Sequence, residues 1–364
     1  MNKIKVFLAR KGVVCSFRQY GVDALGAMAQ GLFCTLLVGT ILNTLGQQLH
    51  IGFLTAPVVS VGTVSYTVGG LASAMVGPGI AVAIGTALHC PPLVLFSLIP
   101  VGFAANAMGG AGGPLAVYAV TIIAAELGKL VSKETRIDIL VTPCVTVIAG
   151  IAVAQLIAAP IGTAARAVGL AIMWATELQP FFMGVLVSAL IGIALTLPIS
   201  SAAICAAFGL TGLAGGAAVA GCCAQMVGFA VMSFKENRWG GLVAQGVGTS
   251  MLQMPNILKN PRTWIPPTLA SMITGPLATC VFKLQMNGSP VSSGMGTCGF
   301  VGQIGVYTGW VSDIAAGTKA AITPMDWIGL VLICFILPAV LSTLFCRVLE
   351  KRGWIREGDM KLDL

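Results

Sequence analysis

Between Asp23 and Glu126 the chain runs for 102 residues, positions 24 to 125, without one Asp, Glu, Lys or Arg. Ionised side chains are costly to bury in hydrocarbon, and about 20 apolar residues cross a bilayer as a helix, so this stretch predicts about four crossings. It also contains 16 Gly and 6 Pro. Helix breaks in a membrane are tolerated where protein or a water-filled cavity satisfies the freed backbone groups. The pattern is typical of a transporter with broken helices.

The rest of the chain has the same character, with 57% hydrophobic and 9% charged residues. We therefore predict one polytopic, all-α membrane domain that contacts the lipid bilayer throughout. The net charge of +8 does not indicate nucleic acid binding, because the basic residues gather in four places. The positive-inside rule predicts that all four are cytoplasmic, which puts both termini inside. The four clusters are Lys3 to Arg18, Lys129 to Arg136, Lys235 to Arg262 and Arg347 to Lys361.

Counting from a cytoplasmic N-terminus, we expect about ten transmembrane helices. They are placed near 24–45, 53–76, 80–104, 112–128, 139–158, 180–198, 201–217, 218–233, 265–282 and 327–346. The Gly-rich segments 201–217 and 218–233 are equally compatible with a re-entrant hairpin. The expected domain organisation is a cytoplasmic amphipathic segment at 1–20, without a cleaved signal, then a transmembrane domain at 21–348 and a cytoplasmic tail at 349–364. A cytoplasmic loop is expected at 235–262.

The stretch from Asn287 to Gly305, NGSPVSSGMGTCGFVGQIG, is too apolar for an ordinary exposed loop and too rich in Gly and Ser for a stable helix. It is best interpreted as a re-entrant hairpin tip. A comparable stretch begins at Asn106, and proline-broken segments recur as APVVSVG and LPISSAAI. Two structural repeats of the transporter type would explain this recurrence. A chance likeness between Gly-rich segments explains it equally well.

Uncharged polar side chains at these breaks are the candidates for substrate binding. In LPISSAAI, two serines follow Pro198, where a helix N-terminus can bind a hydroxylated solute or an anion, or where the serines merely cap a helix. The run PNILKNPRTWIPP either folds into a cavity or is a cytoplasmic linker. The hairpin residues either bind substrate or lie in an exposed extracellular loop. The predicted substrate-binding residues are Asn106, Ser200, Ser201, Asn256, Asn260, Thr263, Ser292, Ser293, Thr297 and Gln303.

Other polar residues are given structural interpretations. His89 is expected to be a packed or interfacial residue in preference to a proton relay. Glu126 has Lys129 and Lys133 at helical spacings, which predicts a salt bridge at the membrane edge. Most of the 11 cysteines are interpreted as packing residues, and only the adjacent Cys222 and Cys223 invite a search for chemistry. We predict no catalytic residue, metal site or cofactor, and therefore a transporter in preference to an enzyme.

Three segments, LPISSAAI, NPRTWIPPTLAS and SGMGTCGFVGQIG, occur in this order within the predicted crossings. The combination resembles PfoR-like membrane proteins, which are related to the enzyme IIC sugar permeases of the bacterial phosphotransferase system. The resemblance implies a homodimeric permease of the bacterial inner membrane, in which re-entrant hairpins hold a sugar between a scaffold part and a moving part. It also implies a cytoplasmic IIB partner that phosphorylates the emerging sugar, and it leaves a regulatory role open.

The chain departs from the family pattern in two respects. GITE-like and NxE-like segments are absent, and Arg262 follows the NP pair where an acid would stand. No fused IIA or IIB domain is expected. The leading hypothesis is a permease that moves a small polar solute, such as a sugar, by alternating access. The alternatives are a membrane sensor or regulator with the 235–262 loop as its output surface, and a secondary transporter coupled to protons or sodium.

Overall fold

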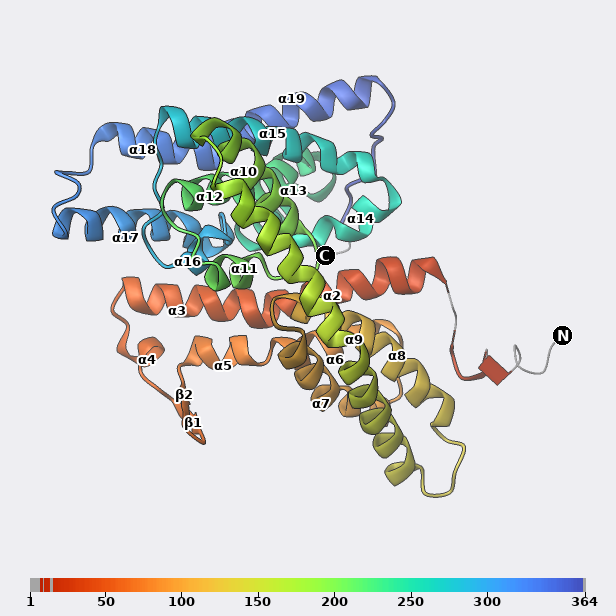
Figure 1. Cartoon of the computed structure of the whole chain (residues 1–364). Coiled ribbons are helices and arrows are strands. Elements are labelled where there is room, and N and C mark those ends of the chain that lie inside the picture. Colours follow the sequence, from red (N-terminus) through yellow and green to blue (C-terminus); the bar gives the residue numbers. More distant parts are fainter. Residues whose placement is uncertain (1–6, 9, 14–15, 363–364) are drawn as a thin grey trace. The chain divides into compact units, whose positions relative to one another are not determined.

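The computed structural model describes residues 7–8, 10–13 and 16–362 (Figure 1). The predicted amphipathic segment at 1–20 therefore lies partly outside the described residues. Contacts divide the chain into two compact units, Met1–Ala165 and Arg166–Leu364, which are described separately. Among the described residues, five helices are long and apolar enough to cross a membrane, or six if one bent pair is counted as a span. The all-α membrane fold is confirmed, while ten crossings and two repeats stay predictions.

The first unit consists of helices and one exposed two-stranded hairpin. Its elements are η1 (Arg18–Asp23), α2 (Ala24–Leu32), η2 (Phe33–Leu37), α3 (Val38–Gln48), α4 (Gly52–Thr55), β1 (Val59–Val61), β2 (Val64–Tyr66), α5 (Val68–Ala74), α6 (Val76–Ala87), α7 (Pro92–Gly109), η3 (Gly110–Gly112), α8 (Gly113–Val131) and most of α9 (Asp138–Thr176). The strands pair antiparallel, with Val59 opposite Tyr66.

Two segments of this unit that were predicted as single crossing helices are interrupted. Residues 53–76 form α4, the exposed hairpin and α5, because Pro57 and Gly62 interrupt any helix there. Residues 80–104 are divided between α6 and α7 by a turn at His89, whose φ is +53°, and by Pro91. The crossing predicted at 112–128 corresponds to α8.

Helices α7 and α8 form an antiparallel hairpin. Gly110, at φ +51° and ψ −122°, reverses the chain after α7, in a region of backbone space that suits glycine. At the far end of the hairpin, Gly128 of α8 lies against Val94 of α7. The Gly-rich stretch that begins at Asn106 is therefore the turn of a helical hairpin.

The second unit is a bundle around one central helix, α12. Its elements are α10 (Pro180–Thr196), α11 (Ser201–Ala207), α12 (Gly212–Met232), α13 (Phe234–Val243), η4 (Ala244–Gly248), η5 (Ser250–Gln253), α14 (Met254–Lys259), η6 (Pro261–Trp264), α15 (Ile265–Pro276), η7 (Leu277–Val281), α16 (Pro290–Ser293), η8 (Cys298–Phe300), α17 (Val301–Ala315), α18 (Pro324–Val331), η9 (Leu332–Ile336) and α19 (Leu337–Lys351).

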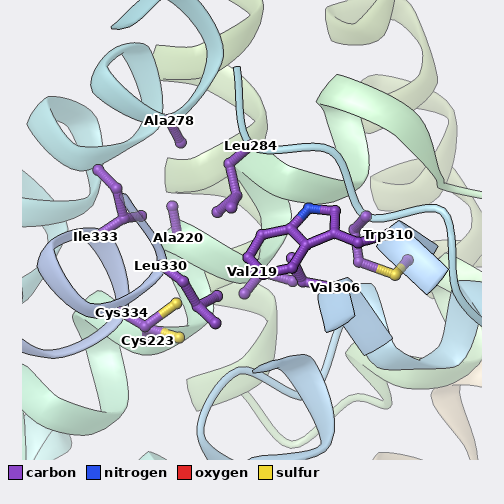
Figure 2. Close-up of a cluster of buried hydrophobic side chains, with 11 residues drawn as sticks. Val219, Ala220, Cys223, Ala278, Leu284, Val306, Trp310, Leu330, Ile333 and Cys334 are labelled. Carbon is purple, nitrogen blue, oxygen red and sulfur yellow. The ribbon is translucent and has the colours of Figure 1, made fainter. Parts of the chain in front are cut away.

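Helix α12 is buried along its length, and α10, α15 and α19 pack around it. Small residues let these helices approach closely, which is the usual way in which helices associate in membranes. Gly221 of α12 lies on the backbone of Ser188 in α10, and Gly275 of α15 lies on Gly184. On another side of α12, Val219, Ala220 and Cys223 form an apolar cluster with residues of η7, α17, α18 and η9 (Figure 2).

The segment predicted as a polar loop at 235–262 is folded into the short elements α13, η4, η5, α14 and part of η6. Gln245, Thr249, Ser250 and Gln253 within it are buried. The hydrogen bond from Gln253 Nε2 to Gln245 Oε1 is 2.8 Å, and Gln245 Nε2 in turn donates to Ser233 Oγ at 2.9 Å. Buried polar chains of this kind hold a segment in one conformation.

Candidate functional site

Two short helices of the second unit, α11 and α16, pack against each other. After α10, residues around Pro198 leave the helical conformation, and α11 then begins with Ser200 as its cap, which accepts from Ala203 N at 3.1 Å. The capping interpretation is thus confirmed for Ser200. Ser201 is buried and donates from Oγ to Gly294 O at 2.7 Å. The broken helix predicted from LPISSAAI therefore exists, and one of its serines holds the hairpin that contains α16.

The predicted hairpin tip folds as a compact turn between α16 and α17, packed on α12. Ser292, Ser293 and Thr297 are buried in it, so the alternative of an exposed extracellular loop is wrong. Ser293 Oγ donates to Leu210 O at 2.6 Å, and Thr297 Oγ1 contacts Met226 Sδ at 3.6 Å. Gly296 permits the close approach, since a Cβ there would lie 2.6 Å from Cys222 Cβ.

Gln303 lies in the first turn of α17. It differs from Ser201, Ser293 and Thr297, because one of its polar atoms has no hydrogen-bond partner in the described part of the chain. Its Nε2 donates to Cys223 Sγ at 3.2 Å, which is a weak hydrogen bond. Its Oε1 is buried and has no hydrogen-bond partner among the described residues. A buried acceptor without a partner costs about 1–3 kcal/mol. We call Ser201, Ser293, Thr297 and Gln303 the hairpin cluster, and it has one open acceptor.

The adjacent cysteines Cys222 and Cys223 are fully buried thiols beside this cluster. Cys222 Sγ lies 3.9 Å from Ser293 O, and Cys223 receives the Gln303 amide. Within the described part of the chain, no group of three His, Cys, Asp or Glu side chains is placed to hold a metal ion. The two sulfur atoms therefore contact the hairpin as weakly polar packing groups.

Three further predicted site residues form hydrogen bonds outside the hairpin cluster: Asn256, Asn260 and Thr263. Asn256 Nδ2 donates to Lys361 O at 2.8 Å, and Asn260 Nδ2 donates to Trp354 O at 2.9 Å, so both hold the C-terminal segment. Thr263 Oγ1 donates to Asn260 O at 2.8 Å. None of these hydrogen bonds of the three predicted substrate-binding residues reaches the hairpin cluster.

The C-terminal segment 354–362, here called the tail, is held by further side chains of the 235–262 segment. The Glu236 carboxylate accepts from Gly358 N and Met360 N, each at 3.0 Å. Asn237 donates to Met360 O and accepts from Leu362 N, each at 2.8 Å. Together with Gln253, Asn256 and Asn260, these residues form a tail clamp, in which polar side chains bind the tail mainly through its backbone.

We expect Asn237→Ala to release the tail. The change removes two hydrogen bonds to tail backbone, each worth about 0.5–1.5 kcal/mol, so opening of the tail becomes roughly tenfold more frequent. Trypsin should then cleave after the exposed Arg356 about tenfold faster, as followed by mass spectrometry of the purified protein. Lys259→Gln is the matched control, because Lys259 is exposed and outside the clamp. Equal cleavage rates in both variants would show that the clamp does not hold the tail.

Gln225 of α12 forms a buried network that sequence reasoning missed. Its Oε1 accepts from Trp264 Nε1 at 3.0 Å and from Thr196 Oγ1 at 3.3 Å, and its Nε2 donates to Thr268 Oγ1 at 3.2 Å. Trp264 and Thr268 also line an apolar groove of about 260 Å³ with Ile193. An amide inside an otherwise apolar helix is a signal that could have identified this network.

In the first unit, Asn106 lies on α7, where its side chain faces Gly77 and Gly113. Glu126 and Lys129 pair at 2.8 Å, so the predicted salt bridge is confirmed. Lys129 is however buried within α8 and does not lie in a loop.

Comparison with known proteins gives one match. A profile of the family described as "Phosphotransferase system, EIIC" matches residues 22–362. No curated protein and no solved structure matches the chain. The profile covers both units and agrees with the apolar helices, so the chain belongs to the phosphotransferase system EIIC family of integral membrane proteins.

Proposed function

We propose that the chain is a membrane permease that moves a small polar solute, a sugar or sugar derivative, by alternating access. Family membership and the apolar helices support a permease of the phosphotransferase type. The observation that supports a polar solute is the hairpin cluster, and above all the Gln303 Oε1 atom, which has no hydrogen-bond partner among the described residues. A solute hydroxyl that donates to Gln303 Oε1 would remove the cost of leaving this atom without a partner.

The small number of hydrogen bonds that hold the hairpin cluster also supports alternating access. Helices α11 and α16 are short, and single hydrogen bonds such as Ser201 Oγ to Gly294 O and Ser293 Oγ to Leu210 O tie the segments together. Uncharged side chains hold a neutral solute without burying an ion, which is costly in a membrane. Movement of the hairpin would break few bonds, and it would carry Gln303 with it.

The family implies a cytoplasmic IIB partner and a sugar substrate in general terms. In this proposal the partner supplies phosphoryl transfer, and the chain contributes binding and movement. We further propose a homodimer in the bacterial inner membrane. The positive-inside rule, applied to the four basic clusters, supports a cytoplasmic position for both termini.

Gln303→Met is expected to abolish most solute uptake while leaving the protein folded. Methionine has a similar volume and no unsatisfied oxygen, so stability should stay equal or rise. Uptake of a labelled sugar panel into proteoliposomes should fall about tenfold or more, with phosphotransfer components present. Gln179→Met is the control, since Gln179 is exposed at the start of α10. Unchanged uptake by Gln303→Met at equal protein amounts would contradict the role of Gln303.

The same assay separates the alternatives. Uptake that follows an imposed proton or sodium gradient without a IIB partner would favour a secondary transporter. Solute binding without any uptake would favour a sensor. In either case the tail clamp occupies polar side chains of the 235–262 segment, so a partner that contacts them has to displace the tail.

A further inference from the structure

The second unit contains a polar cavity of about 480 Å³ that the hairpin cluster does not use. The cavity lies at the end of the bundle opposite the tail. Helix α15 begins next to the tail clamp and runs toward the cavity, and α19 runs back from the cavity end toward the tail. The volume is within the range of about 300–1,000 Å³ that small-molecule sites occupy. We call it the Trp310 cavity, and its lining residues are Phe282, Lys283, Gln285, Asn287, Trp310, Asp313, Thr318, Lys319 and Asp326.

A buried tryptophan forms the floor of this cavity. Trp310 is 3% exposed, and its six-membered ring packs into the apolar cluster near Val219 (Figure 2). Among the described residues its indole N–H has no hydrogen-bond partner, whereas a buried tryptophan N–H usually finds one. Because Trp310 lines the cavity, this donor is available to an acceptor on a ligand.

The polar walls are held in fixed positions by their own contacts. Gly309 of α17 lets the 286–288 segment lie directly on the helix, since a Cβ there would be 2.7 Å from Asn287 N. One turn later, Asp313 Oδ2 accepts from Asn287 Nδ2 at 2.8 Å. Because Asn287 uses its amide hydrogens in this way, its Oδ1 remains an acceptor for the cavity. Asp313 O also accepts from Thr318 Oγ1 at 3.0 Å, which draws the following loop over the cavity.

Charges in the cavity balance. Lys319 pairs with Asp326 at 2.9 Å and lies 5.8 Å from the centre of the Trp310 ring. The second acid, Asp313, is bound to Asn287, and the second base, Lys283, is exposed and has no partner among the described residues. Two acids and two bases leave no net charge. The walls contain both donors and acceptors, which suits a neutral ligand that carries several hydroxyl groups.

Lys283 has a strained backbone. Its φ is +45°, a region that residues with a Cβ seldom adopt. Strain of this kind persists where the surroundings enforce it, and it is concentrated at binding and catalytic sites. The conformation turns the chain at the end of η7 and presents the ammonium group at the cavity rim.

We propose that the Trp310 cavity binds a neutral, polyhydroxylated small molecule and forms a solute site distinct from the hairpin cluster. The Trp310 indole N–H and the Lys283 ammonium donate to ligand oxygens, and Asn287 Oδ1 accepts from a ligand hydroxyl. That this ligand is the same molecule as the transported solute rests on the proposed function. The proposal that the cavity binds a ligand does not depend on that function.

Calorimetric titration of the full chain in detergent tests the site. The probes are glucose, fructose, mannitol and glycerol, with glucose 6-phosphate and gluconate as anionic counterparts. We expect saturable binding of at least one neutral probe and weaker binding of the anions. Trp310→Phe keeps the apolar ring and removes the N–H, so affinity should fall about three- to tenfold. Trp327→Phe is the control, because Trp327 packs against Trp310 with 5.5 Å between ring centres but does not line the cavity.

Lys283→Gly protects the test against a folding defect. Glycine relieves the strained φ, so the thermal midpoint should stay equal or rise, while affinity falls because the ammonium group is lost. The proposal is overturned if no neutral probe saturates, if only anions bind, or if Trp310→Phe and Lys283→Gly bind as the unaltered chain does. Binding that depends on Trp310 without any uptake into proteoliposomes would retain the cavity and contradict the permease. Uptake without binding that depends on Trp310 would retain the permease and contradict the cavity site.

Discussion

Gly221→Ala is expected to prevent the second unit from folding stably. Gly221 is in the middle of α12, where a Cβ would clash with the main-chain oxygen of Ser188 on α10. The clash involves backbone on both sides, so no side chain can rotate away, and one helix has to shift. Gly192 of α10 also approaches α12 closely, since its own Cβ would lie 2.8 Å from Gly221 O. Overpacking of this kind costs about 3 kcal/mol or more.

The measurement is the yield of monodisperse protein in detergent and its thermal unfolding midpoint. Gly246→Ala is the matched control in the same unit, because a Cβ on Gly246 would lie 3.4 Å from Ala230 Cβ, an ordinary contact. The control should be neutral, whereas Gly221→Ala should aggregate or unfold at a much lower temperature. If both variants unfold at the same temperature as the unaltered chain, α10 and α12 do not pack as described.

The fold class followed from the sequence because charge is excluded from hydrocarbon wherever a helix crosses. That physical rule acts on every residue of the 24–125 stretch, so it does not depend on tertiary contacts. The boundaries within the stretch were harder to predict. Residues 53–76 are apolar enough to cross, yet they form an exposed β-hairpin, since hydropathy does not report the turns that Pro57 and Gly62 introduce.

The hairpin cluster was partly predictable for a related reason. Pro198 and the Gly-rich tip mark breaks in the backbone, and polar residues at breaks are unusual in membranes, so Ser201 and Ser293 were found together. The partners of Asn256 and Asn260 were not predictable, because the tail that they bind lies about a hundred residues away, as the separations of 105 and 94 show. Local sequence carries no signal for such contacts.

The Trp310 cavity could not be predicted from the sequence for the same reason. Its wall residues come from the segment that follows η7, from α17, from the loop between α17 and α18, and from the start of α18, and each is unremarkable within its own segment. Only the fold shows that the Trp310 indole N–H lines a cavity and has no hydrogen-bond partner in the described part of the chain. The useful signal in this chain is therefore a buried acceptor without a partner, as in Gln303, or a strained backbone, as in Lys283.

Lys129→Met is expected to destabilise the first unit by about 3–5 kcal/mol, the usual cost of removing one partner from a buried ion pair. Lys129 is 2% exposed and pairs with Glu126 at 2.8 Å. Its Nζ also donates to Gly12 O and Leu88 O, each at 3.1 Å. Neither carboxylate oxygen of Glu126 has a hydrogen-bond partner among the described residues, so the lysine alone balances that charge. Methionine fills the space of the lysine stem but leaves Glu126 buried without a counterion.

A double variant, Lys129→Met with Glu126→Gln, separates loss of charge balance from loss of packing. It should recover most of the stability, because a neutral amide is far cheaper to bury than a carboxylate. Arg10→Gln is the control for an exposed pair, since Arg10 is 63% exposed, bonds Glu134 at 2.7 Å on the surface of the same unit and should change the thermal midpoint little. If the double variant is as unstable as Lys129→Met, the hydrogen bonds to Gly12 and Leu88 matter more than the ion pair. In that case Lys129 would act chiefly by tying α8 to the turn after α6.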